Sequence, residues 1–147
     1  MAEASRAAVN RDPTRVALLT LLLAIALPVS VVHYVDSVAN FADYPKSTVL
    51  PNPSALLIAL SWFAFTAAGV AGYLQYRRRP SPTALLLIAF YSGSGLVGFL
   101  HYSVPGALDM PWWRHLHVIA DILLGVVIFG FAIWAARQPA AVRVTRA

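Results

Sequence analysis

The sequence contains no cysteine and only two methionines among its 147 residues. The absence of cysteine excludes disulfides, thiolate zinc sites, iron–sulfur clusters and cysteine nucleophiles. Met1 and Met110 alone do not make a thioether copper site. Charged residues are scarce as well, at 12% of the chain, where soluble domains have about 25%. The composition therefore excludes an ordinary soluble domain.

What the chain has in quantity is apolar sequence, with 59% hydrophobic residues and a mean hydropathy of +0.68. A membrane-spanning helix needs about 20 mostly apolar residues. Four segments meet this requirement: 16–34, 54–76, 83–101 and 115–136. Backbone groups in hydrocarbon must be hydrogen-bonded within their own segment, and four strands are too few for a barrel. We therefore expect an all-α fold, an antiparallel bundle of four transmembrane helices.

Basic residues predict the orientation of these spans, because nine of the eleven lie on one side of the expected membrane. The nine are Arg6, Arg11, Arg15, Arg77, Arg78, Arg79, Arg137, Arg143 and Arg146. The positive-inside rule then makes 1–15 a cytoplasmic tail, 16–136 the transmembrane domain and 137–147 a second cytoplasmic tail. Aromatic residues gather at the expected outer interface, namely Tyr34, Phe41, Tyr44, Tyr102, Trp112 and Trp113. We expect a multi-pass protein of the cytoplasmic (inner) membrane.

The net charge of +5 is explained by this topology, so we expect no nucleic-acid partner. The first span has the basic start and apolar stretch of a signal peptide. It is not interpreted as one, because no cleavage site followed by a soluble chain appears and three further spans follow. The expected partners are the lipid bilayer and either further copies of this chain or a larger membrane complex.

Ionisable residues other than arginine and lysine concentrate in the outer half of the expected bundle. The eight residues are His33, His101, His115, His117, Asp36, Asp43, Asp109 and Asp121. Helical spacing of three and four places six of them, all except His115 and Asp109, on shared faces. The faces are Ser30, His33, Asp36 or Ser37, Asn40 and Asp43 in the first helix, Tyr91, Ser94, Gly98 and His101 in the third, and Arg114, His117, Asp121 and Gly125 in the fourth.

Asp121 lies about two turns inside the fourth apolar run. A charged carboxylate at such a depth costs at least ~2.5 kcal/mol, so it should face the interior of the bundle and have a partner. The candidate partners are His117, Arg114, His33 and His101.

Three histidines from three helices, with two carboxylates at similar depth, predict a metal site. We expect His33, His101 and His117 to bind a divalent metal such as zinc or iron. Asp36 and Asp121 are expected either as further ligands or as hydrogen-bond acceptors that orient the imidazoles. A metal-bound water would support hydrolysis of an ester, amide or phosphoester. The sequence does not decide whether the protein is an enzyme.

Three alternatives stay open at this stage. Four-helix membrane bundles hold haem b between facing histidines, and Gly93, Gly95 and Gly98 would make room for the macrocycle. A non-catalytic accessory subunit of a membrane complex is the second alternative, since Ala64, Ala68 and Gly72 form a stripe suited to helix docking. A proton or substrate pathway is the third.

Four residues near the cluster are expected to have other roles. Arg114 is interpreted as an anchor to lipid headgroups rather than a binder of a substrate anion. Asp43 and Asp109 lie in loops and are expected to be solvated. His115 is expected on the surface.

Overall fold

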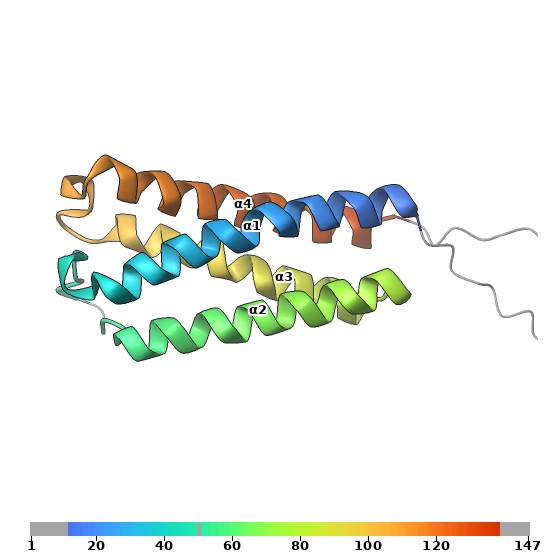
Figure 1. Ribbon diagram of the computed structural model, residues 1–147, viewed down its shortest axis with the longest axis horizontal. Helices are drawn as coiled ribbons and strands as arrows, with labels where there is room; N and C mark the ends of the chain where they lie inside the picture. The colour runs from blue at the N-terminus through green and yellow to red at the C-terminus, as the bar shows by residue number, and fades with distance from the viewer. Residues whose placement is uncertain (1–11, 50, 139–147) are drawn as a thin grey trace, which may run out of the picture.

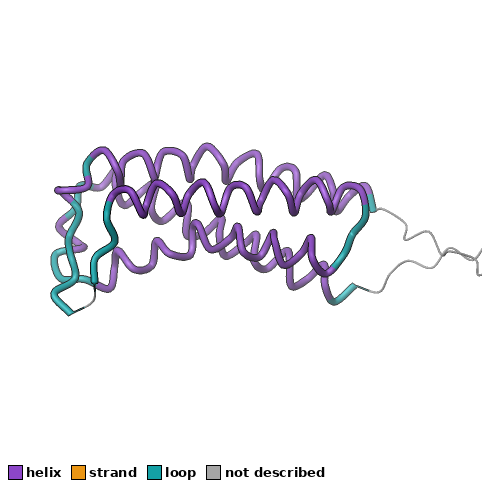
Figure 2. The backbone as a smooth tube through the Cα atoms, turned by 90° about the horizontal axis from the view of Figure 1, so that it is seen from below, coloured by secondary structure: helices purple, strands orange, loops and turns teal. Residues whose placement is uncertain are grey.

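The computed structural model describes residues 12–49 and 51–138. Its elements are α1 (Pro13–Ala39), η1 (Phe41–Asp43), α2 (Ala55–Arg78), α3 (Pro82–Leu96), η2 (Val97–Ser103), η3 (Ala107–Asp109) and α4 (Trp112–Ala136). The described residues contain helices, turns and loops and no strand, which confirms the all-helical prediction (Figure 2). Most of the two predicted tails, 1–11 and 139–147, lies outside the described residues.

Four helical stretches are long and apolar enough to cross a membrane: α1, α2, α3 continued by η2, and α4. They match the four segments expected from the sequence, each a few residues longer at one or both ends. Helices of this number and composition indicate a multi-pass membrane protein.

Local signals explain where these helices begin. The Asp12 carboxylate accepts a hydrogen bond from the backbone N–H of Thr14 at 3.0 Å, and Pro13 occupies the first turn of α1. Ser81 caps α3 in the same way, accepting from the backbone N–H of Ala84 at 3.2 Å. The short turn 79–81, between α2 and α3, follows from the prolines at 80 and 82, as the sequence indicates.

The four long helices lie side by side, with each packed against two neighbours (Figures 1 and 2). We call the end that carries the 40–54 and 104–111 connections the polar end (Figure 1). The opposite end carries the 79–81 turn, together with the first and last described residues, 12 and 138.

Apolar packing dominates away from the polar end. A buried cluster there joins all four helices and consists of Leu19, Ala26, Tyr76, Ala84, Ile88, Tyr91, Ile128, Phe131, Ala132 and Ala135. Large apolar side chains are also exposed along every long helix, for example Leu21, Phe63, Leu86 and Leu123. An apolar surface of this extent is typical of helices that face lipid.

Two glycines let α3 and α4 approach closely just below the polar end. A Cβ atom at Gly95 would collide with the backbone carbonyl of Asp121, and one at Gly125 would lie 2.8 Å from the carbonyl oxygen of Ser92. Small residues at such positions allow backbones to meet in membrane proteins. This contact fixes the depth of Asp121 relative to α3.

Candidate functional site

The polar end contains a cluster of buried polar side chains contributed by α1, η2 and α4. The predicted face of the first helix is confirmed in part: Ser30, His33, Asp36 and Ser37 are buried, whereas Asn40 is half-buried and Asp43 exposed, because α1 ends at Ala39. In the other two predicted faces all residues are buried except His101, which is half-buried: Tyr91, Ser94, Gly98 and His101, and Arg114, His117, Asp121 and Gly125. The helix α2 contributes none of the histidines or acids in this cluster.

His33 and Asp121 form the deepest contact of the cluster. The Nδ1 atom of His33 lies 2.7 Å from Oδ2 of Asp121, and each side chain is only 3% exposed. Of the partners considered for Asp121, the structure therefore selects His33. An ionised carboxylate only accepts hydrogen bonds, so Nδ1 of His33 carries the proton and Nε2 keeps its lone pair.

Nε2 of His33 is hydrogen-bonded to Nε2 of His101 at 3.3 Å, and the ring centroids are 5.4 Å apart. With the proton of His33 on Nδ1, His101 is the donor of this hydrogen bond. His101 belongs to η2, the 3-10 continuation of α3. Residues three apart lie in line in a 3-10 helix, so His101 stands directly above Gly98, whose missing side chain leaves space for Ile122.

His117 lies on the other side of His33, at a ring-centroid distance of 5.6 Å. Its Nε2 atom approaches Oδ2 of Asp36 to 3.3 Å, but the geometry is not that of a hydrogen bond. Both ring nitrogens of His117 are buried without a hydrogen-bond partner among the described residues. The three predicted imidazoles thus meet, and one of them has unused nitrogens.

Asp36 is the centre of a second group of contacts. Its Oδ2 atom accepts hydrogen bonds from Nε of Arg114 at 2.9 Å and from the hydroxyl of Tyr44 at 2.5 Å. Its Oδ1 atom accepts from the side-chain amide of Asn40 at 2.6 Å. Both oxygens of the Asp36 carboxylate thus accept hydrogen bonds, and the guanidinium of Arg114 neutralises its charge.

Tyr44 and Arg114 are the residues of this group whose roles the sequence did not indicate. Tyr44 was grouped with interfacial aromatics and Arg114 with headgroup anchors, yet their exposed fractions are 7% and 4%. Burial, together with the hydrogen bond to Asp36, raises the pKa of the Tyr44 phenol. The one sequence feature that could have indicated the contact is that Tyr44 follows Asp36 by only eight residues. The contact also requires the chain to turn back at η1, which this spacing does not reveal.

The remaining acids and histidine of the polar end lie outside the cluster. The Asp43 side chain is 66% exposed, at 3.8 Å from Nη2 of Arg114, and Asp109 is exposed. His115 is half-buried and stacks on Tyr102, whose hydroxyl lies 3.0 Å from its Nδ1 atom. His115 and His117 therefore point to different sides of α4.

As it stands, the described part of the chain holds no group of three or more histidine or acidic side chains arranged to bind a metal ion. The reason is visible in the contacts above, since Asp36 and Asp121 face polar partners. Ligation by the predicted residues stays a prediction. Side chains of neighbouring helices fill the space beside two of the glycines expected to make room for haem. A Cβ at Gly93 would meet Phe65, and one at Gly98 would meet Ile122.

Comparison with protein-family models, curated proteins and solved structures finds no match to this chain.

Proposed function

We propose that this protein is an integral protein of the cytoplasmic membrane that binds one divalent transition-metal ion at its polar end. In this proposal the four long helices form an antiparallel transmembrane bundle. The polar end faces outward and both termini are cytoplasmic, since nine of eleven basic residues belong to the other end and the tails.

The observation that carries the metal proposal is the distance of 3.3 Å between the Nε2 atoms of His33 and His101. Two imidazoles bound to a tetrahedral metal at 2.0–2.1 Å would have their nitrogens about 3.3 Å apart. Because Nδ1 of His33 is engaged by Asp121, a metal ion would take the place of the proton that now lies between the two Nε2 atoms. Imidazole pairs suit zinc and iron, and the rest of the cluster offers no soft ligand that would favour copper(I).

Asp121 is positioned like the carboxylates that orient metal-binding histidines, since it contacts the nitrogen of His33 that faces away from His101. Such carboxylates accept the proton of the nitrogen not bound to metal, which fixes the tautomer and raises the basicity of the ligand. We assign the same supporting role to Asp36 rather than that of a ligand, since Arg114, Tyr44 and Asn40 already engage its oxygens.

His117 supplies the third imidazole after its ring turns towards His33. Its nitrogens make no hydrogen bond, although the turn would give up the 3.3 Å contact of Nε2 with Asp36, and its ring already lies 5.6 Å from that of His33. Three imidazoles leave one position of a tetrahedral ion open for water, as in hydrolytic zinc sites. Hydrolysis is therefore the reaction class that this donor set supports.

The test is metal content and affinity in protein purified in mild detergent. We expect about one equivalent of zinc or iron by elemental analysis, and rebinding of Zn²⁺ by calorimetry after removal with a chelator. The variant His101→Ala should lose most of this affinity, because it removes one of the two facing nitrogens.

The matched control is His115→Ala, which removes a histidine two residues from His117 whose ring stacks on Tyr102 outside the cluster. It should bind Zn²⁺ like the original protein. The proposal is wrong if purified protein neither contains nor rebinds a stoichiometric metal, or if His101→Ala and His115→Ala behave alike.

The accessory-subunit alternative receives no comparable support. Of its stripe of small residues, Gly72 is used inside the molecule, where a Cβ would lie 2.9 Å from Leu87. Ala64 is exposed, and nothing in the described contacts indicates which partner would cover it.

A further inference from the structure

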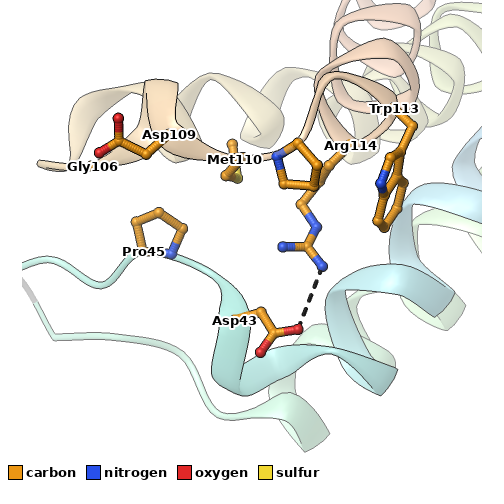
Figure 3. Close-up of a pocket in the computed structure, with 8 residues that line it drawn as sticks. Asp43, Pro45, Gly106, Asp109, Met110, Trp113 and Arg114 are labelled. Atoms are coloured by element: carbon orange, nitrogen blue, oxygen red, sulfur yellow. Dashed lines mark ion pairs between the residues drawn. The ribbon is translucent and has the colours of Figure 1, made fainter.

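A second polar feature of the polar end is a pocket that Arg114 lines (Figure 3). Its volume is about 410 Å³. The lining comes from the two connections at this end and the start of α4, and consists of Asp43, Pro45, Gly106, Asp109, Met110, Pro111, Trp113 and Arg114. None of the three clustered histidines lines it.

Arg114 is the only cationic side chain of the lining, and it is held rigidly. Its side chain is 5% exposed, and its Nε atom donates to Asp36 at 2.9 Å. The guanidinium lies 4.5 Å from the ring centroid of Tyr44 and 5.0 Å from that of Trp113. These contacts engage Nε and the planar faces, which leaves the outer edge of the guanidinium directed at the pocket (Figure 3).

The two terminal nitrogens of Arg114 make no hydrogen bond to any described residue. The Nη2 atom lies 3.8 Å from Oδ2 of Asp43, beyond hydrogen-bond distance. These terminal N–H groups are the donors that a ligand entering the pocket would meet.

We propose that this pocket binds the phosphate group of a phosphate ester, either a phospholipid headgroup or a soluble ester. The terminal N–H groups of arginine match two oxygens of a phosphate in a bidentate pair. The volume exceeds that of a phosphate alone and leaves room for the organic part of the ester beside Met110 and Pro45. This site uses none of the three histidines and shares with the metal proposal only the contact between Arg114 and Asp36.

Asp43 acts as a competitor for the phosphate. Its carboxylate is 66% exposed and faces the same edge of Arg114 that the phosphate would use (Figure 3). An entering anion must displace it and overcome its repulsion. Removal of the Asp43 charge should therefore tighten phosphate binding. This direction is distinctive, because replacing a charged residue that contacts a ligand usually weakens binding of that ligand.

The experiment is calorimetric titration of inorganic phosphate into detergent-purified protein from which metal has been removed. Asp43→Asn should bind phosphate about two- to fivefold more tightly than the original protein, the range expected for an exposed ion pair. The matched control is Asp12→Asn, another exposed aspartate paired with an arginine, Arg15, at the opposite end. This control should change nothing.

Arg114→Lys keeps the charge and removes the bidentate pair, so phosphate binding should weaken by about tenfold. Its folding is checked separately by thermal unfolding, and the Asp43→Asn result does not depend on it. A parallel measurement in nanodiscs of phosphatidylglycerol identifies the source. If the protein retains phosphatidylglycerol and inorganic phosphate does not displace it, the ligand is a lipid headgroup. If inorganic phosphate displaces the lipid, the ligand is a soluble phosphate ester.

The proposal is overturned if neither inorganic phosphate nor phosphatidylglycerol binds, or if Asp43→Asn and Asp12→Asn give equal affinities. Its failure is separable from that of the metal proposal. His101→Ala should keep phosphate binding and lose Zn²⁺, and Asp43→Asn should keep Zn²⁺.

Discussion

Nδ1 of His33 lies 2.7 Å from Oδ2 of Asp121, so residues 88 positions apart join α1 to α4 inside the polar end. Neither side chain has an alternative hydrogen-bond partner of this quality among the described residues. The pair leaves Nε2 of His33 pointing at His101. The geometry of this contact leads to the first prediction.

Asp121→Asn should lower the affinity for Zn²⁺ by about 10- to 100-fold, the usual effect of losing a carboxylate that orients a metal-binding histidine. The amide has nearly the same shape and still accepts the hydrogen bond of His33, so the fold should persist. Competition with a chromophoric chelator measures the affinity. Asp109→Asn, at an exposed aspartate of the same end, is the control, and equal affinities of the two variants would refute the role given to Asp121.

The buried ion pair between Asp36 and Arg114 should matter for stability. Asp36→Ala leaves the Arg114 guanidinium buried without its carboxylate, which should lower the free energy of unfolding by about 3–5 kcal/mol. Denaturant unfolding in detergent micelles measures it. Asp12→Ala removes the exposed pair with Arg15 and one helix cap, and should cost only about 1 kcal/mol. Similar losses in the two variants would contradict this view of Asp36.

The close approach of α3 and α4 predicts different outcomes for two glycine-to-alanine changes. Gly95→Ala places a methyl group against the carbonyl of Asp121 and should destabilise the protein by about 1–3 kcal/mol. Gly130→Ala adds the same methyl where no atom lies within 4 Å, and should be neutral or slightly stabilising. The thermal unfolding temperature in detergent compares the two variants. If Gly95→Ala leaves this temperature unchanged, α3 and α4 can move apart at little cost.

The absence of cysteine makes the proposed orientation easy to test. Leu108→Cys introduces a thiol at a position 82% exposed in the 104–111 connection, and Arg79→Cys introduces one in the 79–81 turn. In intact cells a membrane-impermeant maleimide should label Leu108→Cys alone. Arg79→Cys should react only after permeabilisation. The reverse pattern would invert the topology and place the histidine cluster on the cytoplasmic side.

The helices could be predicted closely because their apolar runs have membrane-spanning length and are interrupted by proline and charge. The convergence of His33, His101 and His117 followed from spacings of three and four along each helix, combined with equal depth. The cost of burying Asp121 pointed to a partner, although spacing alone did not choose His33 among four candidates.

Other parts of the site depend on tertiary contacts that periodicity does not encode. Tyr44 reaches Asp36 only because η1 turns the chain back over the end of α1. Arg114 looked like a headgroup anchor because it follows two tryptophans, and its burial depends on the Asp36 carboxylate of another helix. The 3-10 form of η2, which sets the position of His101, has no distinct signature in an apolar, glycine-containing segment.

The α1–α4 contact also constrains biogenesis. In the proposed transmembrane bundle, His33 and Asp36 would enter the bilayer with the first helix, whereas their partners Asp121, Arg114 and His117 belong to α4, the last of the four long helices in the chain. Until α4 was inserted, the polar stripe of α1 would lack counter-charges and would be costly in lipid. In that arrangement, a chain arrested before α4 would expose this stripe to lipid.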